Sequence, residues 1–116
     1  MQKEFDIPHQ ELENISQSLA NLFFQRRDLY PRQLDDGRYV CIQKPLKTWH
    51  VVSHLRGDLT LGTYILSADS LARFIVFDAD DEGQFAQLKE MVRFFSEQGA
   101  PGYLEQSRRG GHLWLF

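Results

Sequence analysis

The sequence RFIVFDADD, at residues 73–81, carries the strongest structural signal in the chain, and SRRGGHLWLF, at residues 107–116, complements it. The apolar run at 71–77 predicts a buried strand that stops abruptly at acidic residues. Residues two apart in an extended chain point to the same side, so Asp78 and Asp80 project together. Two convergent carboxylates suit a hard cation such as Mg²⁺ or Mn²⁺. The alternative interpretation is a solvated turn whose acids cap the next helix.

A helix and two further strands are predicted after the acids. Apolar residues recur at helical spacing between polar ones, at Phe85, Leu88, Val92 and Phe95. Gly99 ends this helix, and Pro101 prevents it from resuming. Residues 102–105 and 112–116 then read as strands, the second of them apolar and aromatic.

The segment between these strands, Ser107-Arg108-Arg109-Gly110-Gly111, is called the basic loop below. Its glycines allow close approach of the backbone, and arginine offers a planar fork to phosphate oxygens. The loop therefore predicts an anion site, unless it is a hairpin turn whose arginines serve solubility. Adjacent strands would bring it close to Asp78 and Asp80. An acidic pair for metal beside a basic loop for phosphate is what phosphoryl transfer requires.

This arrangement resembles the archaeo-eukaryotic primase superfamily, in particular the primase-polymerase branch of bacterial conflict and mobile-element systems. That superfamily carries D-x-D at a strand end, matched by Asp78 and Asp80, and later a small polar residue shortly before a histidine, matched by Ser107 and His112. Three upstream segments also resemble the branch: FQRRDLY at 24–30, HLRG at 54–57 and LGTY at 61–64. The resemblance covers the chain from about residue 23 onward.

The resemblance implies an α/β (α+β) fold. Residues 1 to about 70 would form a helix-plus-strands subdomain, packed on the first half of an RRM-like, ferredoxin-like subdomain from about 71 to 116. A third superfamily motif, an apolar residue followed by a metal-binding aspartate, would fall beyond Phe116. We therefore expect residues 1–116 to be the N-terminal portion of a longer catalytic core, inactive without that third carboxylate.

The resemblance also implies a chemistry, namely template-directed nucleotidyl transfer for primer synthesis or DNA or RNA polymerisation in replication. Asp78 and Asp80 would be the catalytic ligands of two Mg²⁺ or Mn²⁺ ions. Ser107 and His112 would contact nucleotide phosphates. Arg108 and Arg109 inherit no role from the family but join the nucleotide-binding candidates. The implied partners are NTPs or dNTPs and a single-stranded DNA or RNA template, with helicase or nuclease modules in the same protein or operon.

The composition fits a globular protein. The chain has 116 residues, of which 42% are hydrophobic, so it is one domain or part of one. No apolar run approaches the ~20 residues of a membrane span, which predicts no membrane association. A single cysteine, Cys41, allows no internal disulfide and favours the cytoplasm. With a net charge of −3, nucleic-acid binding would depend on local basic patches.

The N-terminal half begins with a predicted helix from Pro8 to about Gln25. Its expected apolar stripe consists of Leu12, Ile15, Leu19, Leu22 and Phe23. Arg26 and Arg27, near Tyr30, are candidates for gripping a nucleic-acid strand, or else form a solvated helix end.

Two strands are predicted further along, at 38–43 and 60–66. Between them His50 and His54 lie four residues apart, which on a helix would suit a metal; structural histidines are the favoured interpretation. By the resemblance, His54 would line the template or nucleotide side.

Two other functions compete with the polymerase. A non-enzymatic RRM-like nucleic-acid-binding module would use the strand at 109–116, with its basic, glycine and aromatic residues. A haloacid-dehalogenase-like phosphohydrolase would also use a D-x-D strand end and a later serine, but Glu82 stands where that class has threonine or valine.

Overall fold

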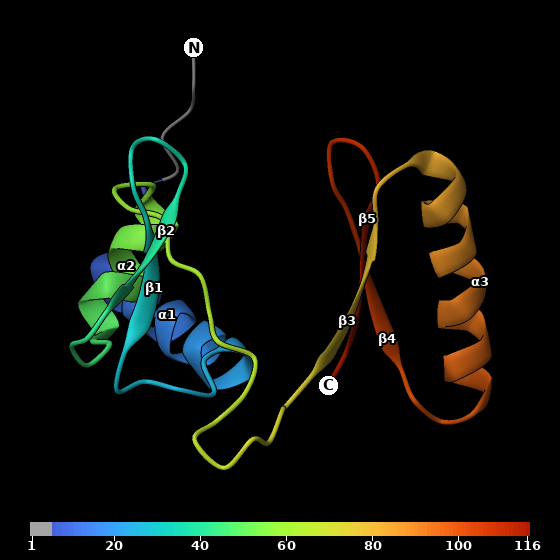
Figure 1. Ribbon diagram of the computed structural model, residues 1–116, viewed down its shortest axis with the longest axis horizontal. Coiled ribbons are helices and arrows are strands. Elements are labelled where there is room, and N and C mark those ends of the chain that lie inside the picture. Colours follow the sequence, from blue (N-terminus) through green and yellow to red (C-terminus); the bar gives the residue numbers. More distant parts are fainter. Residues whose placement is uncertain (1–5) are drawn as a thin grey trace. The chain divides into compact units, whose positions relative to one another are not determined.

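The computed structural model describes residues 6–116 and divides into two compact units, unit 1 (Met1–Arg73) and unit 2 (Phe74–Phe116). Helices and two antiparallel sheets make up the fold, which confirms the α/β (α+β) class (Figure 1). Across residues 6–116, none of the helices combines the length and hydrophobicity that crossing a bilayer requires.

Unit 1 packs two helices with a two-stranded sheet (Figure 1). Its elements are α1 (His9–Phe23), β1 (Tyr30–Gln33), β2 (Tyr39–Ile42) and α2 (Thr48–Arg56). The strands pair antiparallel, with Tyr30 opposite Ile42. The core of the unit consists of Ala20, Phe24, Tyr30, Val51 and Leu61.

The predicted apolar stripe of α1 is partly wrong. Leu12, Ser16 and Ala20 are buried at a spacing of four, whereas Ile15 and Leu22 are 42% and 47% exposed. The small side chains of Ser16 and Ala20 allow α2 to approach this face of α1 closely. The buried face is therefore rotated toward small residues that a search for large apolar ones overlooks.

The strand predicted at 60–66 is also wrong. This segment makes only two backbone hydrogen bonds to β1, from Gln33 N to Thr60 O and from Gly62 N to Pro31 O, both 2.9 Å. Pro31 has no N–H to extend the ladder, so only an isolated bridge forms. The same proline concealed β1 itself, because proline within a run argues against a strand.

Unit 2 is a three-stranded antiparallel sheet with one helix on one face (Figure 1). Its elements are β3 (Ile75–Ala79), α3 (Glu82–Glu97), β4 (Gly102–Gln106) and β5 (Gly111–Leu115). The order β3-β5-β4 places β5 between two mutually parallel strands joined through α3. This is a split βαβ unit, the connection found in ferredoxin-like folds. Ala79, Leu88 and the fully buried Leu113 form its core.

The predicted acidic strand differs in position and burial. β3 begins at Ile75, not at residue 71, and it includes Asp78 and Ala79. It is not a buried strand, since Ile75 is 59% exposed. Among the strands of residues 6–116, β3 pairs only with β5, so it lies at the edge of the sheet and its apolar residues are covered on one side only.

Candidate active site

The acidic turn lies at the end of β3. Ala79 is 3% exposed, whereas Asp78 and Asp80 are exposed. Asp81 caps α3, because its Oδ1 accepts a 2.7 Å hydrogen bond from Gln84 N, and Gln84 Oε1 accepts a 2.7 Å bond from Asp80 N. The capping interpretation therefore applies to Asp81, and the carboxylates of Asp78 and Asp80 remain outside the cap.

The basic loop forms a tight turn between β4 and β5. Ser107 N donates to Gly110 O at 3.0 Å, and Gly110 N donates to Ser107 Oγ at 3.2 Å. This closure presents Arg108 and Arg109 at the exposed tip. No acidic residue among 6–116 forms an ion pair with either arginine, so both guanidinium groups can accept an anion.

Gly110 holds the basic loop against the acidic turn. A Cβ atom at this position would lie 2.0 Å from Ala79 O and 3.0 Å from Asp81 N. Gly111 is equally constrained, since its Cβ would lie 2.2 Å from Glu105 O. No side chain fits at these distances, so Gly110 is required for the contact between the loop and the turn, and Gly111 for the close approach of β5 to Glu105 and Phe85.

The acids and the basic loop line one open hollow of about 520 Å³. Its lining consists of Asp78, Ala79, Asp80, Ser107, Arg108 and Arg109. The structure thus brings together two carboxylates, a hydroxyl and two guanidinium groups that lie about 30 residues apart in the sequence. Their catalytic and nucleotide-binding roles stay predictions.

His112 lies beside this hollow, in a row of three side chains across the sheet. It is opposite Asp78 on β3 and opposite Glu105 on β4. His112 Nε2 is 3.4 Å from Asp78 Oδ1, and His112 Nδ1 is 2.5 Å from Glu105 Oε1. A carboxylate at Nδ1 places a proton there and fixes the orientation of the ring.

Glu105 was missed by the sequence reasoning. Its signal was the hairpin: a four-residue loop at 107–110 pairs Gln106 with Gly111 and therefore Glu105 with His112. Unless the register of these two strands is known, the sequence does not show that this carboxylate lies beside the histidine.

The carboxylate oxygens of Asp78 and Asp80 are the kind of ligand that a hard divalent cation such as Mg²⁺ prefers. Mg²⁺ is commonly held by one or two carboxylates, with water and substrate phosphates completing its shell. Two carboxylates in one hollow with a hydroxyl and two guanidinium groups fit that pattern. Within residues 6–116 no group of three or more histidine, cysteine or acidic side chains is placed to hold a metal. The residues fit a metal shared with a bound nucleotide better than a closed protein cage.

The nucleic-acid candidates of unit 1 do not lie together on its surface. Tyr30 is a core residue, 6% exposed, and its hydroxyl lies 3.1 Å from His50 Nε2. His54 Nδ1 accepts a 3.0 Å bond from Leu61 N. Both histidines of α2 are thus satisfied by structural bonds, as the favoured interpretation of them predicted.

Arg26 and Arg27, the two arginines among these candidates, differ in the side chains to which they bond. Arg26 Nε forms a 2.9 Å ion pair with Asp28 Oδ1, and this contact raises the pKa of Arg26 and lowers the pKa of Asp28. Arg27 instead donates to Asn21 Oδ1 at 2.9 Å. Only Arg27 keeps its charge unpaired by an acid of residues 6–116.

The sequence was also compared with known proteins. Residues 40–116 match the family described as the TOTE conflict system, Archaeo-Eukaryotic Primase domain. No curated protein matches the chain. The matched region covers more than half of the 116 residues. It contains β2 from its second residue onward, α2 and the whole of unit 2, with the acidic turn, the basic loop and His112. The chain therefore belongs to the archaeo-eukaryotic primase family, in its TOTE conflict-system branch.

Proposed function

We propose that this domain provides the metal and nucleotide site for metal-dependent, template-directed nucleotidyl transfer, which is primer synthesis or strand extension from NTPs or dNTPs. The observation that carries the proposal is the hollow of unit 2, where Asp78 and Asp80 face the basic loop. Nucleotidyl transfer needs groups that neutralise and orient a triphosphate, and the hollow offers both kinds.

Each residue has a distinct part in the proposal. Asp78 and Asp80 would hold Mg²⁺ or Mn²⁺, which when bound stabilises the attacking and leaving oxygens. Arg108 and Arg109 bind the triphosphate, since arginine forms paired hydrogen bonds with phosphate oxygens. His112 would contact the phosphates through Nε2, which lies 3.4 Å from Asp78 Oδ1 beside the hollow, while Glu105 holds its Nδ1. Glu105 is thus a positioning residue.

A second candidate function has one observation in its favour. Tyr103 and Trp114 are register partners on the sheet face that carries His112, and Tyr103 is 61% exposed. Aromatic side chains on such a face stack on bases in RRM-type modules. A non-enzymatic binder would not need metal. The haloacid-dehalogenase-like alternative is wrong, because the chain belongs to the primase family.

Two measurements test the enzymatic proposal. Mn²⁺ binding, followed by electron paramagnetic resonance, should weaken at least tenfold when Asp78→Asn and Asp80→Asn are combined, because both charged ligands are lost while the side-chain shapes are kept. Asp35→Ala, an acid in a turn of unit 1, is the control and should bind like the wild type.

Extension of a primer on a single-stranded template, with Mg²⁺ or Mn²⁺ and labelled NTPs or dNTPs, then tests the reaction. Product that disappears in the double variant supports the proposal. Unchanged Mn²⁺ binding by the double variant would refute the metal assignment. Metal-independent binding of the template, without product and without Mn²⁺ binding, would favour the RRM-like alternative.

A further inference from the structure

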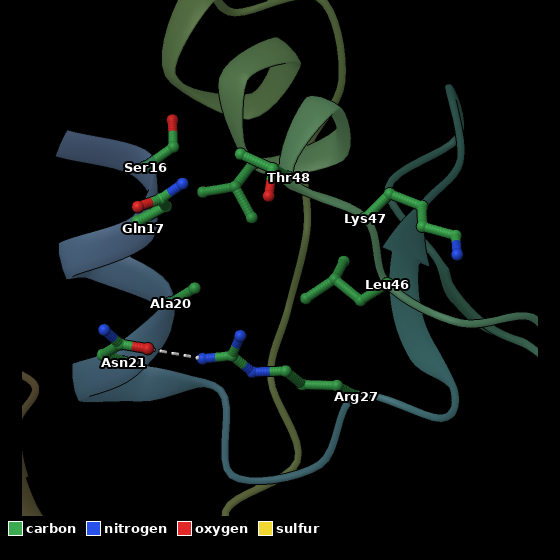
Figure 2. Close-up of a pocket in the computed structure, with 9 residues that line it drawn as sticks. Ser16, Gln17, Ala20, Asn21, Arg27, Leu46, Lys47 and Thr48 are labelled. Carbon is green, nitrogen blue, oxygen red and sulfur yellow. Dashed lines mark hydrogen bonds between the residues drawn. The ribbon is translucent and has the colours of Figure 1, made fainter. Parts of the chain in front are cut away.

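A second hollow lies within unit 1, between α1, the segment before β1 and the start of α2 (Figure 2). Its volume is about 280 Å³. Ser16, Ala20 and Val51 are buried and form its floor. The polar residues Gln17, Asn21, Arg27 and Thr48 surround it. No acidic side chain is among the described residues that line it, so the hollow is electrostatically suited to an anion.

Arg27 is held in place over this hollow. Its Nη2 donates to Asn21 Oδ1 at 2.9 Å, and its Nε lies 3.5 Å from Phe24 O. Its backbone oxygen accepts a 2.8 Å bond from Leu46 N. The remaining terminal nitrogen, Nη1, points into the hollow (Figure 2). An arginine anchored in this way loses little side-chain entropy when it binds a ligand.

Arg27 differs in its partners from Arg26 and Arg38 of the same unit. Arg26 and Arg38 each form an ion pair with a nearby aspartate, at 2.9 and 2.7 Å. Arg27 is bonded only to neutral oxygen atoms, those of Asn21 and Phe24. Its positive charge is therefore oriented but not neutralised within residues 6–116.

The start of α2 adds to the positive potential on the opposite side. Thr48 is its first residue, and its hydroxyl lines the hollow. The first turn contains no acid, and the side-chain bond at the cap is neutral: His50 Nδ1 accepts a 2.8 Å hydrogen bond from Lys47 N. The N-cap residue is Lys47, whose side chain extends away from the hollow in Figure 2. A helix N-terminus is the positive end of the helix dipole, so Arg27 and α2 both favour negative charge here.

We propose that this hollow binds a phosphate group, carried by a nucleic-acid strand or by a free nucleotide. Arg27 supplies the charged donor, and Thr48 and Asn21 supply neutral polar groups at the rim. The volume is near the lower limit of about 300 Å³ for small-molecule pockets, so it admits a phosphate with part of its ester but not a large cofactor. The site lies wholly in unit 1 and does not depend on the function proposed for unit 2.

Nuclear magnetic resonance of the 116-residue chain tests the site, in buffer with a chelator so that no metal contributes. Inorganic phosphate should shift the backbone amide signals of Thr48 and Trp49 and the side-chain signal of Arg27. Thymidine monophosphate and a single-stranded oligothymidylate are then compared. A tenfold preference for the oligonucleotide would identify a strand phosphate as the ligand, and equal affinities would identify a free phosphate ester; both outcomes support the site. Absence of shifts around the hollow with all three probes would overturn it.

Variants separate this site from general surface charge. Arg27→Gln should weaken binding about tenfold or more, because it removes a charge-assisted hydrogen bond. Arg38→Gln removes the same charge from the same unit outside the hollow and should change the affinity less than twofold. For the oligonucleotide, Arg27→Gln should also reduce the slope of log affinity against log salt by about 0.7, the value for one phosphate on a single strand.

Two milder variants keep the test decisive if Arg27→Gln fails to fold. Arg27→Lys retains the charge without the anchored fork, and Thr48→Val removes only a hydroxyl; each should weaken binding a few-fold. Equal losses in Arg27→Gln and Arg38→Gln, or unchanged binding in all three hollow variants, would show that the hollow binds no phosphate.

Discussion

Gly110→Ala tests the contact that joins the basic loop to the acidic turn. The new Cβ would lie 2.0 Å from Ala79 O, whereas ordinary contact begins at 3.4 Å. The obstacle is backbone, so it cannot rotate away. The loop must therefore move off the turn, which strains both hydrogen bonds between Ser107 and Gly110.

The expected cost follows from these two effects. Overpacking of this kind costs about 1–3 kcal/mol, and a weakened hydrogen bond costs about 0.5–1.5 kcal/mol. With both hydrogen bonds weakened, unit 2 should thus lose about 2–6 kcal/mol of its free energy of unfolding. Gly83→Ala is the matched control, because its Cβ meets only Asp81 Oδ1, at 3.4 Å, within a helix where alanine is favoured.

Urea unfolding followed by Trp114 fluorescence measures the difference. A Trp49→Phe background leaves only Trp114, which lies in unit 2, as the reporter. Gly83→Ala should unfold at the same urea concentration as the background protein or a higher one. If Gly110→Ala were as stable as Gly83→Ala, the loop would not rest on the turn, and the reasoning about the hollow of unit 2 would be refuted.

Four further outcomes are expected. Leu113→Ala removes the fully buried centre of the unit 2 core and should cost about 2–5 kcal/mol in urea unfolding; a loss below about 1 kcal/mol would contradict the packing. Tyr30→Phe removes the partner of His50 Nε2 and should cost about 1–3 kcal/mol in urea unfolding followed by Trp49 fluorescence in a Trp114→Phe background, because Trp49 lies in unit 1; no change would show that the bond is unimportant. Burial lowers the pKa of His50 in the folded protein. The free energy of unfolding should therefore be fully retained above the unfolded pKa of about 6.5 and should fall below it, by up to about 1.4 kcal/mol per pH unit. A free energy of unfolding that rises as the pH is lowered from about 7 to about 5.5 would contradict this. Glu105→Gln should change the ring-nitrogen chemical shifts of His112 at fixed pH, and an unchanged spectrum would exclude Glu105 as its positioning residue.

The parts of unit 2 predicted most reliably from the sequence were those with strong local signals. The period of Phe85 and Leu88 and the stop at Gly99 defined α3, and the aromatic run ending at Phe116 defined β5. Local pattern could not show that β3 lies at an edge, because strand order is set by pairing between distant segments.

The residues of the candidate site also fall into two groups: those that the local sequence predicts and those that only the fold reveals. Asp78, Asp80 and the basic loop were identified from residue type and spacing, and the structure places them around one hollow. The position of Glu105 depends on hairpin register, and the proposed phosphate site of Arg27 depends on three segments meeting in space. Neither leaves a motif in the linear sequence, since the groups involved are ordinary surface residues until the fold brings them together.

The strand order β3-β5-β4 has a consequence for how the protein is made. β5 lies between the other two strands but follows both in the sequence. A chain emerging from the ribosome therefore exposes β3, α3 and β4 before the strand that connects them exists. His112 on β5 comes to lie between Asp78 and Glu105 in that same final step. Unit 2 thus forms its sheet and the row of Asp78, His112 and Glu105 late and together.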